Sequence, residues 1–263
     1  MTIFTKNYRK FKLRHATFLI FLVTSIFTTV ASAETSLQET KTNTPKYVRV
    51  VEPIGHSHQY IQKNEALLYW QISPYYISQL TDSSCSLASA TMIVNAVRSS
   101  QKFAANQPLV TQNDLLHRVN DIDWIKGVRE GGDGVTLDQL SLLMTKALEA
   151  YGVHNFTIQV VHLKRDSKKN ESMLHQTLVE MEKTGKTFMI ANFNQKFFTG
   201  AMSVGHFAPV GAYDLQMRRV LIMDPYRQFY EPYWVPEKLF LESMATIDNK
   251  AGRHRGYLLV KLK

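Results

Sequence analysis

The sequence predicts an α+β fold in which an N-terminal helical part packs on a C-terminal antiparallel β-sheet part. Apolar side chains recur at helical spacing in residues 85–99 and 137–148, and a third helical segment covers 172–184. After Thr187 the pattern changes to short apolar runs separated by polar turns, at residues 188–191, 207–213, 220–223 and 257–260. Helices followed by mostly antiparallel strands are typical of proteins whose helices are segregated from the sheet.

Two helix ends carry clear local signals. Thr136 follows the glycine-rich turn at 131–134 and has the side chain of a good N-cap for the helix after it. Gly185 follows the third helical segment, and glycine is the residue that most often ends a helix. Both positions therefore support the predicted helices.

Two more strands are predicted in the N-terminal part, at 156–161 and at 47–51, the latter ending before Pro53. The chain has 263 residues, 44% of them hydrophobic and 11% aromatic. This is enough apolar material for one sizeable core, and it excludes a disordered chain.

The first 33 residues predict a cleaved secretory signal peptide. Residues 1–15 hold five Lys and Arg and no acid, 16–30 are mainly apolar, and Ala31-Ser32-Ala33 follows. The alternative is a membrane anchor, but Thr and Ser interrupt the apolar run, and a spanning helix needs about 20 apolar residues. We expect export to a periplasm or out of the cell, with no stable membrane insertion after cleavage.

The remaining chain divides into a linker and one domain. Residues 34–46 are rich in Thr, Ser and Gln and predict a linker, so the domain covers 47–263. Without the first 33 residues the chain holds 26 basic and 22 acidic residues, and its formal charge falls from +9 to +4. This mild charge, without a basic helix carrying aromatic side chains, predicts no nucleic-acid partner.

Cys85 is the only cysteine in the chain, so it cannot form an internal disulfide. A lone thiol in an exported protein is either buried or used in chemistry, and by itself Cys85 fits both. It begins the helical segment 85–99, where the helix dipole favours a nucleophilic thiolate. Gln79, six residues earlier, could donate its amide to the oxyanion that forms when a thiolate attacks a carbonyl.

His206 is the candidate general base and acid among nine histidines. Gly205 leaves space beside its imidazole, and an apolar strand follows it. The other histidines fit surface or hydrogen-bonding positions. His56 and His58 form a pair that is typical of metal ligands, but companion ligands at suitable spacing are lacking, so no metal site is predicted.

Asp224 is the candidate partner of His206. If 207–213 and 220–223 pair as a hairpin, the residue before the first strand lies near the residue after the second. The Asp224 carboxylate would then hold the imidazole in one tautomer and stabilise its charged form. Taken alone, Asp224 also fits an ordinary Asp-Pro turn at the end of a strand.

These residues and their surroundings resemble the phytochelatin synthases, which are papain-like cysteine transpeptidases acting on glutathione. The resemblance extends over about residues 47–263, and its motifs occur in the family's order. They are Gln79 with Cys85, Ala88-Ser89, Gly134-Val-Thr-Leu-Asp-Gln-Leu140, Gly205-His-Phe-Ala-Pro209, Asp224 with Arg227, Trp234-Val-Pro236 and Arg255-Gly-Tyr257.

The resemblance implies a papain-like catalytic domain over 47–263. It implies that Cys85 attacks the Cys–Gly bond of glutathione, releases glycine and carries a γ-glutamylcysteinyl thioester. Water or a second glutathione then accepts this acyl group, giving γ-Glu-Cys or a phytochelatin. It further implies a role in heavy-metal handling, in which Cd²⁺ or Zn²⁺ acts as a thiolate complex with the substrate, and a homodimer.

The resemblance also implies substrate contacts. The γ-glutamyl group is expected at Asn192, Gly205, Asp248 and Arg255, because its free α-amino and α-carboxylate groups need an anion and a cation. An ordinary surface pair is the alternative for Asp248 and Arg255. Arg227 is expected to shape the acceptor site or to hold Asp224.

Two departures from the family pattern concern the site. Ser86 stands where the family usually has glycine, and it could narrow the acyl site. Pro225 and Tyr226 follow Asp224 where small residues are usual. The competing hypotheses are a leader-cleaving papain-like peptidase and an exported binding protein with a buried thiol.

Overall fold

The computed structural model describes residues 44–99, 101–164, 167–200 and 203–263. These belong to one compact unit, Asn43–Lys263. The predicted signal peptide and most of the predicted linker lie outside the described residues, so both remain predictions. Within the described ranges, no helix has the length and hydropathy of a membrane span.

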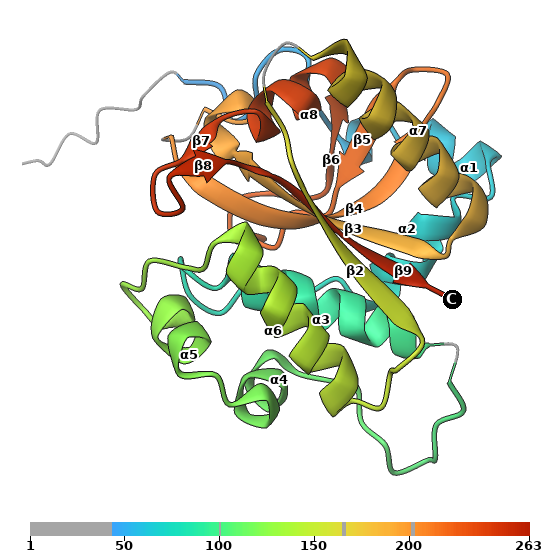
Figure 1. The fold of residues 1–263 in the computed structure, drawn as a ribbon. Coiled ribbons are helices and arrows are strands. Elements are labelled where there is room, and N and C mark those ends of the chain that lie inside the picture. The colour runs from blue at the N-terminus through green and yellow to red at the C-terminus, as the bar shows by residue number, and fades with distance from the viewer. Residues whose placement is uncertain (1–43, 100, 165–166, 201–202) are drawn as a thin grey trace, which may run out of the picture. The chain divides into compact units, whose positions relative to one another are not determined.

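Seven of the described strands form one antiparallel sheet in the order β1-β6-β5-β4-β3-β9-β2 (Figure 1). A separate two-stranded ribbon, β7 with β8, lies beside it. The strands of the large sheet are β1 (Glu52–Pro53), β2 (Phe156–His162), β3 (Thr187–Asn194), β4 (Gly205–Asp214), β5 (Arg219–Ile222), β6 (Tyr233–Pro236) and β9 (Gly256–Leu262); the ribbon is β7 (Ile247–Asp248) and β8 (Arg253–His254).

Helices cover both faces of the sheet. In Figure 1 α3 to α6 lie on one side of it, and α7 and α8 lie on the other. The helices are α1 (Gln59–Lys63), α2 (Leu67–Ile72), α3 (Cys85–Arg98), α4 (Gln112–Val119), α5 (Ile122–Val128), α6 (Leu137–Ala150), α7 (Lys168–Thr184) and α8 (Glu237–Met244).

The sheet is buried on both faces, and β3 shows how. Phe188 and Ile190 pack in the cluster that includes α3 and α6, whereas Met189 and Ala191 pack in the cluster that includes α7 and α8. Successive side chains of a strand point to opposite faces, so a strand between two helical layers needs apolar residues throughout. This explains the continuous apolar run in the sequence.

The predicted α+β class and the predicted helices are confirmed. Thr136 caps α6 in a capping box with Gln139, and Gly185 ends α7 with φ of +61°. The predicted hairpin is β4 with β5. In the second helical layer, α7 was predicted from the sequence. Helix α8 was not, because it is short and follows β6 without a turn signal.

The predicted strand at 47–51 is wrong. Tyr47 makes only an isolated bridge with Thr199, and the N–H of Val51 bonds back to the carbonyl of Val48 at 2.9 Å. This turn directs the chain so that pairing with the sheet begins at β1 instead. Residues 48–51 therefore form a turn, and Val51 is buried by side-chain packing and not by strand pairing.

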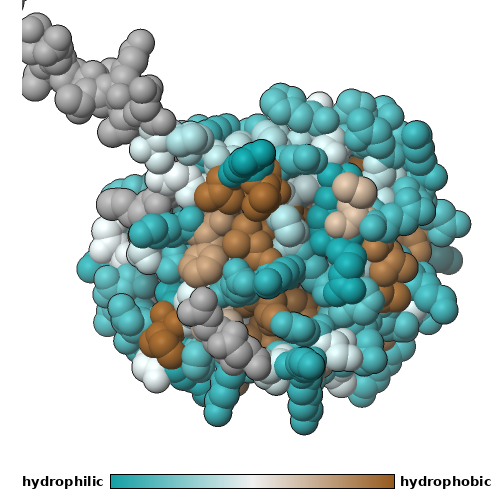
Figure 2. Space-filling view, turned by 90° about the horizontal axis from the view of Figure 1, so that it is seen from above, coloured by the Kyte–Doolittle hydropathy of each residue, from teal (hydrophilic) through white to brown (hydrophobic). Residues whose placement is uncertain are grey.

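A groove of about 450 Å³ lies on the face that carries α7 and α8. Figure 2 looks onto this face and shows hydrophobic residues surrounded by hydrophilic ones. The groove is lined by residues of both helices, including Leu174, Leu241 and Glu237, and by Met217 and Arg218 of the turn between β4 and β5. Because α3 packs on the opposite face of the sheet, this groove is separate from Cys85.

Candidate active site

Cys85 is the first residue of α3 and has 8% of its surface exposed. The hydroxyl of Ser84, the preceding residue, does not cap the helix and instead accepts the N–H groups of Leu80 and Thr81 at 2.9 and 2.8 Å. The loop before Cys85 is thus held by Ser84, while the first turn of α3 keeps N–H groups without a side-chain cap. These N–H groups and the positive end of the helix dipole can stabilise negative charge that develops at the start of α3.

One hydrogen bond fixes α3 against the strand that carries the candidate base. Ser89, one turn beyond Cys85, donates to the carbonyl of Phe207 at 3.2 Å, and both residues are buried. Phe207 follows His206 directly in β4. This bond brings the start of α3 to the start of β4, so that Cys85 lies close enough to His206 to help raise the pKa of the imidazole.

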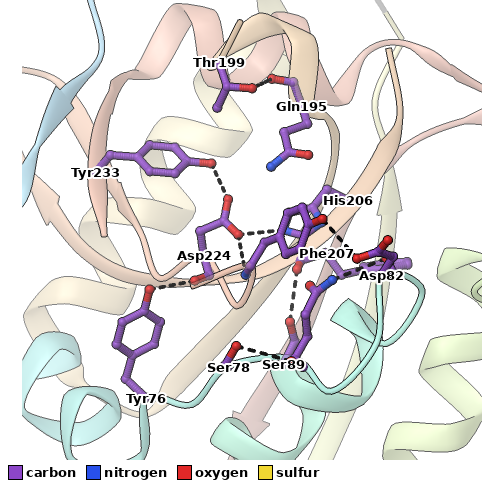
Figure 3. Close-up of polar contacts among 12 residues, drawn as sticks. Tyr76, Ser78, Asp82, Ser89, Gln195, Thr199, His206, Phe207, Asp224 and Tyr233 are labelled. Atoms are coloured by element: carbon purple, nitrogen blue, oxygen red, sulfur yellow. Dashed lines mark hydrogen bonds and ion pairs between the residues drawn. The ribbon is translucent and has the colours of Figure 1, made fainter. Parts of the chain in front are cut away.

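His206 and Asp224 form a buried pair (Figure 3). Nε2 of His206 lies 2.8 Å from Oδ1 of Asp224, and 4% of His206 and 0% of Asp224 are exposed. The structure therefore brings together the thiol, the imidazole and the carboxylate that the sequence predicted. Because Nε2 faces Asp224, Nδ1 is the nitrogen of the imidazole that is left to exchange a proton with Cys85.

A bulge sets the register that joins these two residues. Tyr213 pairs with Val220, but the register shifts at Gly211, so that Val210 pairs with Ile222 and Pro209 accepts the N–H of Met223. Continued beyond the Val210–Ile222 pair, this register would place Tyr226 opposite His206, so Asp224 lies two residues from the directly opposite position. The two side chains meet diagonally, which remains within reach of an imidazole.

The charges of the pair stabilise each other. Burial alone would lower the pKa of His206, but the Asp224 carboxylate and Cys85 outweigh it and raise this pKa to about 10. Burial alone would raise the pKa of Asp224, but His206, the N–H of Tyr226 and the hydroxyl of Tyr233 hold it below its usual value. The imidazole is thus charged at neutral pH, which suits a proton donor to a leaving amine.

Gln79 lies beside this pair, although its amide is occupied. Its N–H donates to the carbonyl of Pro225 at 2.8 Å, which anchors it next to Asp224. Its side-chain Nε2 donates to the carbonyls of Thr81 and Asp82 at 2.9 and 3.3 Å. The predicted oxyanion role therefore requires this amide to exchange a loop carbonyl for the substrate, and it stays a prediction.

Ser86 does not narrow the acyl site in this structure. It is fully buried, and its hydroxyl accepts the indole N–H of Trp124 at 3.2 Å. The side chain therefore points toward α5 and the core. The extra hydroxyl is used in packing the helical layer.

Three of the predicted substrate contacts lie at the adjacent ends of β4, β3 and β9. Arg255 precedes Gly256, which pairs with Asn192, and a Cβ built on Gly205 would stand 2.7 Å from Nη2 of Arg255. Burial lowers the pKa of Arg255, and nearby Asp248 counteracts this. These four residues are thus close to one another.

Arg227 lies on the other side of His206. Its guanidinium is exposed and stacks on the ring of Tyr76 at 4.5 Å. Tyr76 donates its hydroxyl to the main-chain carbonyl of Asp224 at 2.6 Å. Arg227 therefore contacts the loop that supports Asp224 and not the group around Arg255.

Two tyrosines that bind Asp224 were not predicted from the sequence. Tyr233 donates its hydroxyl to Oδ2 of Asp224 at 2.7 Å and is fully buried, and Tyr76 binds the main chain. Tyr233 reaches Asp224 because β6 pairs with β5, which places Tyr233 opposite Ile222. Within the described part of the chain, no group of three or more His, Cys, Asp or Glu residues could hold a metal ion.

The model of the phytochelatin synthase family matches residues 56–257. The chain belongs to this family. Its matched region includes the whole of α3 and both His206 and Asp224. The resemblance stated from the sequence motifs is therefore confirmed.

Relatives of this phytochelatin synthase domain carry the name glutathione gamma-glutamylcysteinyltransferase. The chain is 27% identical over 199 residues to enzyme 3 of Lotus japonicus, covering 74% of the chain and 38% of the relative. It is 26% identical over 209 residues to that of Schizosaccharomyces pombe, covering 76% and 45%. The chain thus spans less than half of these relatives.

A solved structure, Pseudomonas avirulence protein AvrPphB, overlaps 73% of this chain and 99% of its own at 12% identity, with a TM-score of 0.34. A TM-score this low supports no conclusion about fold or function. The papain-like character of the phytochelatin synthase domain rests on its own arrangement, a cysteine helix packed against an antiparallel sheet that carries His206 and Asp224.

Proposed function

We propose that this chain is a cysteine acyltransferase that cleaves the Cys–Gly bond of glutathione. The Cys85 thiolate attacks the carbonyl carbon of this bond, and the C–S bond forms as the C–N bond breaks. His206 gives its proton to the departing glycine amine, which leaves a γ-glutamylcysteinyl thioester on Cys85 and a neutral imidazole. Water or a second glutathione then takes the acyl group.

The choice of glutathione as the substrate rests on two buried polar atoms near His206. Oδ1 of Asn192 and Nε of Arg255 are buried and have no hydrogen-bond partner among the described residues. Leaving such groups unpaired costs free energy, so they are suited to a ligand that supplies the partners. A γ-glutamyl group brings an ammonium for the Asn192 oxygen and a carboxylate for the guanidinium.

The remaining family expectations are proposals of the same kind. Cd²⁺ or Zn²⁺ would act as part of a metal–glutathione thiolate substrate, so added metal should change product formation without binding the free protein. Export would follow from the sequence of the first 33 residues, and a homodimer from family analogy alone. Metal-dependent turnover, N-terminal sequencing of the exported protein and sedimentation test these three proposals separately.

The alternatives predict different behaviour. A leader-cleaving peptidase would cut peptides that contain no γ-glutamyl group, and the buried Asn192 and Arg255 would have no role in it. A binding protein with a buried thiol would not need the 2.8 Å contact between His206 and Asp224. Both alternatives leave the family match over residues 56–257 unexplained.

The deciding experiment incubates the protein with glutathione, with and without Cd²⁺ or Zn²⁺. Mass spectrometry should detect free glycine together with γ-Glu-Cys or longer products. Cys85→Ala should release no glycine, and the wild-type protein should show an acyl adduct on Cys85 in rapidly quenched samples. No glycine release under any of these conditions would contradict the proposed function.

A further inference from the structure

A hydrogen bond connects two loops beside His206. The hydroxyl of Tyr226 donates to Oδ1 of Asp82 at 3.0 Å, and the N–H of Tyr226 donates to Oδ1 of Asp224 at 2.8 Å. Asp82 lies three residues before Cys85. The Tyr226 residue thus links the loop that carries the acid to the loop that leads to the nucleophile. In the view of Figure 3, His206 lies between Asp224 and Asp82.

The connection is held at both ends. The N–H of Gln79 donates to the carbonyl of Pro225 at 2.8 Å, so the same two loops are joined through the main chain as well. The ring of Tyr226 packs against Phe229, with centroids 4.7 Å apart. Two further contacts therefore hold the Asp82–Tyr226 bridge in place beside the site.

The sheet order assigns this bridge to one side of His206. β4 carries His206, with β3 and β9 on one side of it and β5 on the other. Asn192 and Arg255, the proposed contacts of the acyl group, belong to the β3 and β9 side. Tyr226 follows β5, so the bridge lies on the side of His206 opposite the proposed acyl contacts, which is the side left for the departing glycine and for the acceptor.

The bridge also brings a negative charge to the acceptor side, while the guanidinium of Arg227, on the same side, is stacked on the ring of Tyr76. Asp82 is exposed and takes part in none of the ion pairs formed by the described residues. A glutathione acceptor carries two carboxylates, one of them on the carbon that bears its amine, whereas water carries none. Like charges at short range disfavour the anionic acceptor.

We propose that Asp82 and Tyr226 determine acceptor specificity, favouring water and small neutral amines over glutathione. This inference rests on the proposed function. In the step concerned, the acceptor gives one proton to neutral His206 while its oxygen or nitrogen bonds to the acyl carbon. The C–S bond breaks, and Cys85 returns as a thiolate beside a charged imidazole.

The test measures the ratio of transfer to hydrolysis at saturating glutathione. Asp82→Asn keeps an acceptor for the Tyr226 hydroxyl and removes the charge, and Tyr226→Phe keeps the ring and removes the bond. Glu171→Gln is the matched control, because it removes an exposed acid from α7 on the opposite face of the sheet. Hydroxylamine serves as a neutral acceptor in parallel assays.

Asp82→Asn should raise the ratio of glutathione transfer to hydrolysis about tenfold at low salt, and less at high salt. Transfer to hydroxylamine should change little, and Tyr226→Phe should raise glutathione transfer several-fold. Glycine release by the wild-type protein tests the proposed function on its own. If glycine is released but neither variant changes the ratio, the acceptor inference is wrong and the proposed function stands.

Discussion

Gly205 and Arg255 are so close that a Cβ at position 205 would stand 2.7 Å from Nη2 of the guanidinium. The obstructing atom is the end of a flexible side chain, so the protein can absorb a methyl group there by displacing the guanidinium. Any larger residue at position 205 therefore changes the position of Arg255 and leaves the backbone in place.

Gly205→Ala should raise the KM for glutathione about ten- to hundredfold while kcat changes much less, because a charge-assisted contact to the γ-glutamyl carboxylate is lost. Steady-state kinetics on glutathione measures this split. Gly55→Ala is the control, since a Cβ there meets nothing within 4 Å. An equal fall in kcat and kcat/KM for Gly205→Ala would argue against Arg255 as a substrate contact.

Asp224→Asn should lower the rate of glycine release about a hundredfold or more, because an amide cannot stabilise the charged imidazole. It should also move the alkaline limb of the pH–rate profile. In the wild-type protein that limb is expected near pH 10, where His206 loses its proton. Without the carboxylate the limb should lie several pH units lower. A limb at the same pH in both proteins would exclude His206 as the group that titrates.

The same shift predicts how stability depends on pH. The pKa of His206 is raised from 6.5 to about 10 in the folded protein. The stabilisation is therefore complete below pH 6.5 and is lost as the pH rises toward 10. Urea unfolding between pH 6.5 and 10 should show the wild-type free energy falling relative to that of Asp224→Asn. A constant difference across this range would contradict the charged pair.

The sequence was sufficient for the triad because each member has a local signal. Cys85 begins a helix, His206 follows glycine at the start of a strand, and Asp224 follows the next strand. The bulge at Gly211 was not visible, because the register shift depends on the packing of Met223 and Leu221 against that glycine. Local pattern predicts pairing, but it does not give the register within it.

Contacts between distant segments were not predictable from local pattern. Tyr233 reaches Asp224 only because β6 pairs with β5, and the strand signal for β6 is four residues long. Ser86 was expected to affect the acyl site, since sequence gives the position of a residue in a helix but not the face that a neighbouring helix covers. Trp124, from α5, decides that Ser86 faces the core.

Ser86→Ala should destabilise the protein by about 1–3 kcal/mol, because the buried indole N–H of Trp124 loses its acceptor. Ser86→Gly, which introduces the residue usual in the family, should cost about a further 1 kcal/mol through helix propensity. Urea unfolding measures both. Ser141→Ala is the control, since that hydroxyl donates to the carbonyl of Asp138 within its own helix, at the half-exposed surface of α6.

The same Ser86 variants should leave the glutathione KM and the ratio of transfer to hydrolysis within about twofold of wild type, because the Ser86 hydroxyl is fully buried against Trp124. This separates a role in packing from a role in the acyl site. A variant that kept wild-type stability but changed KM severalfold would show that Ser86 contacts the substrate. The Trp124 bond would then not be its main function.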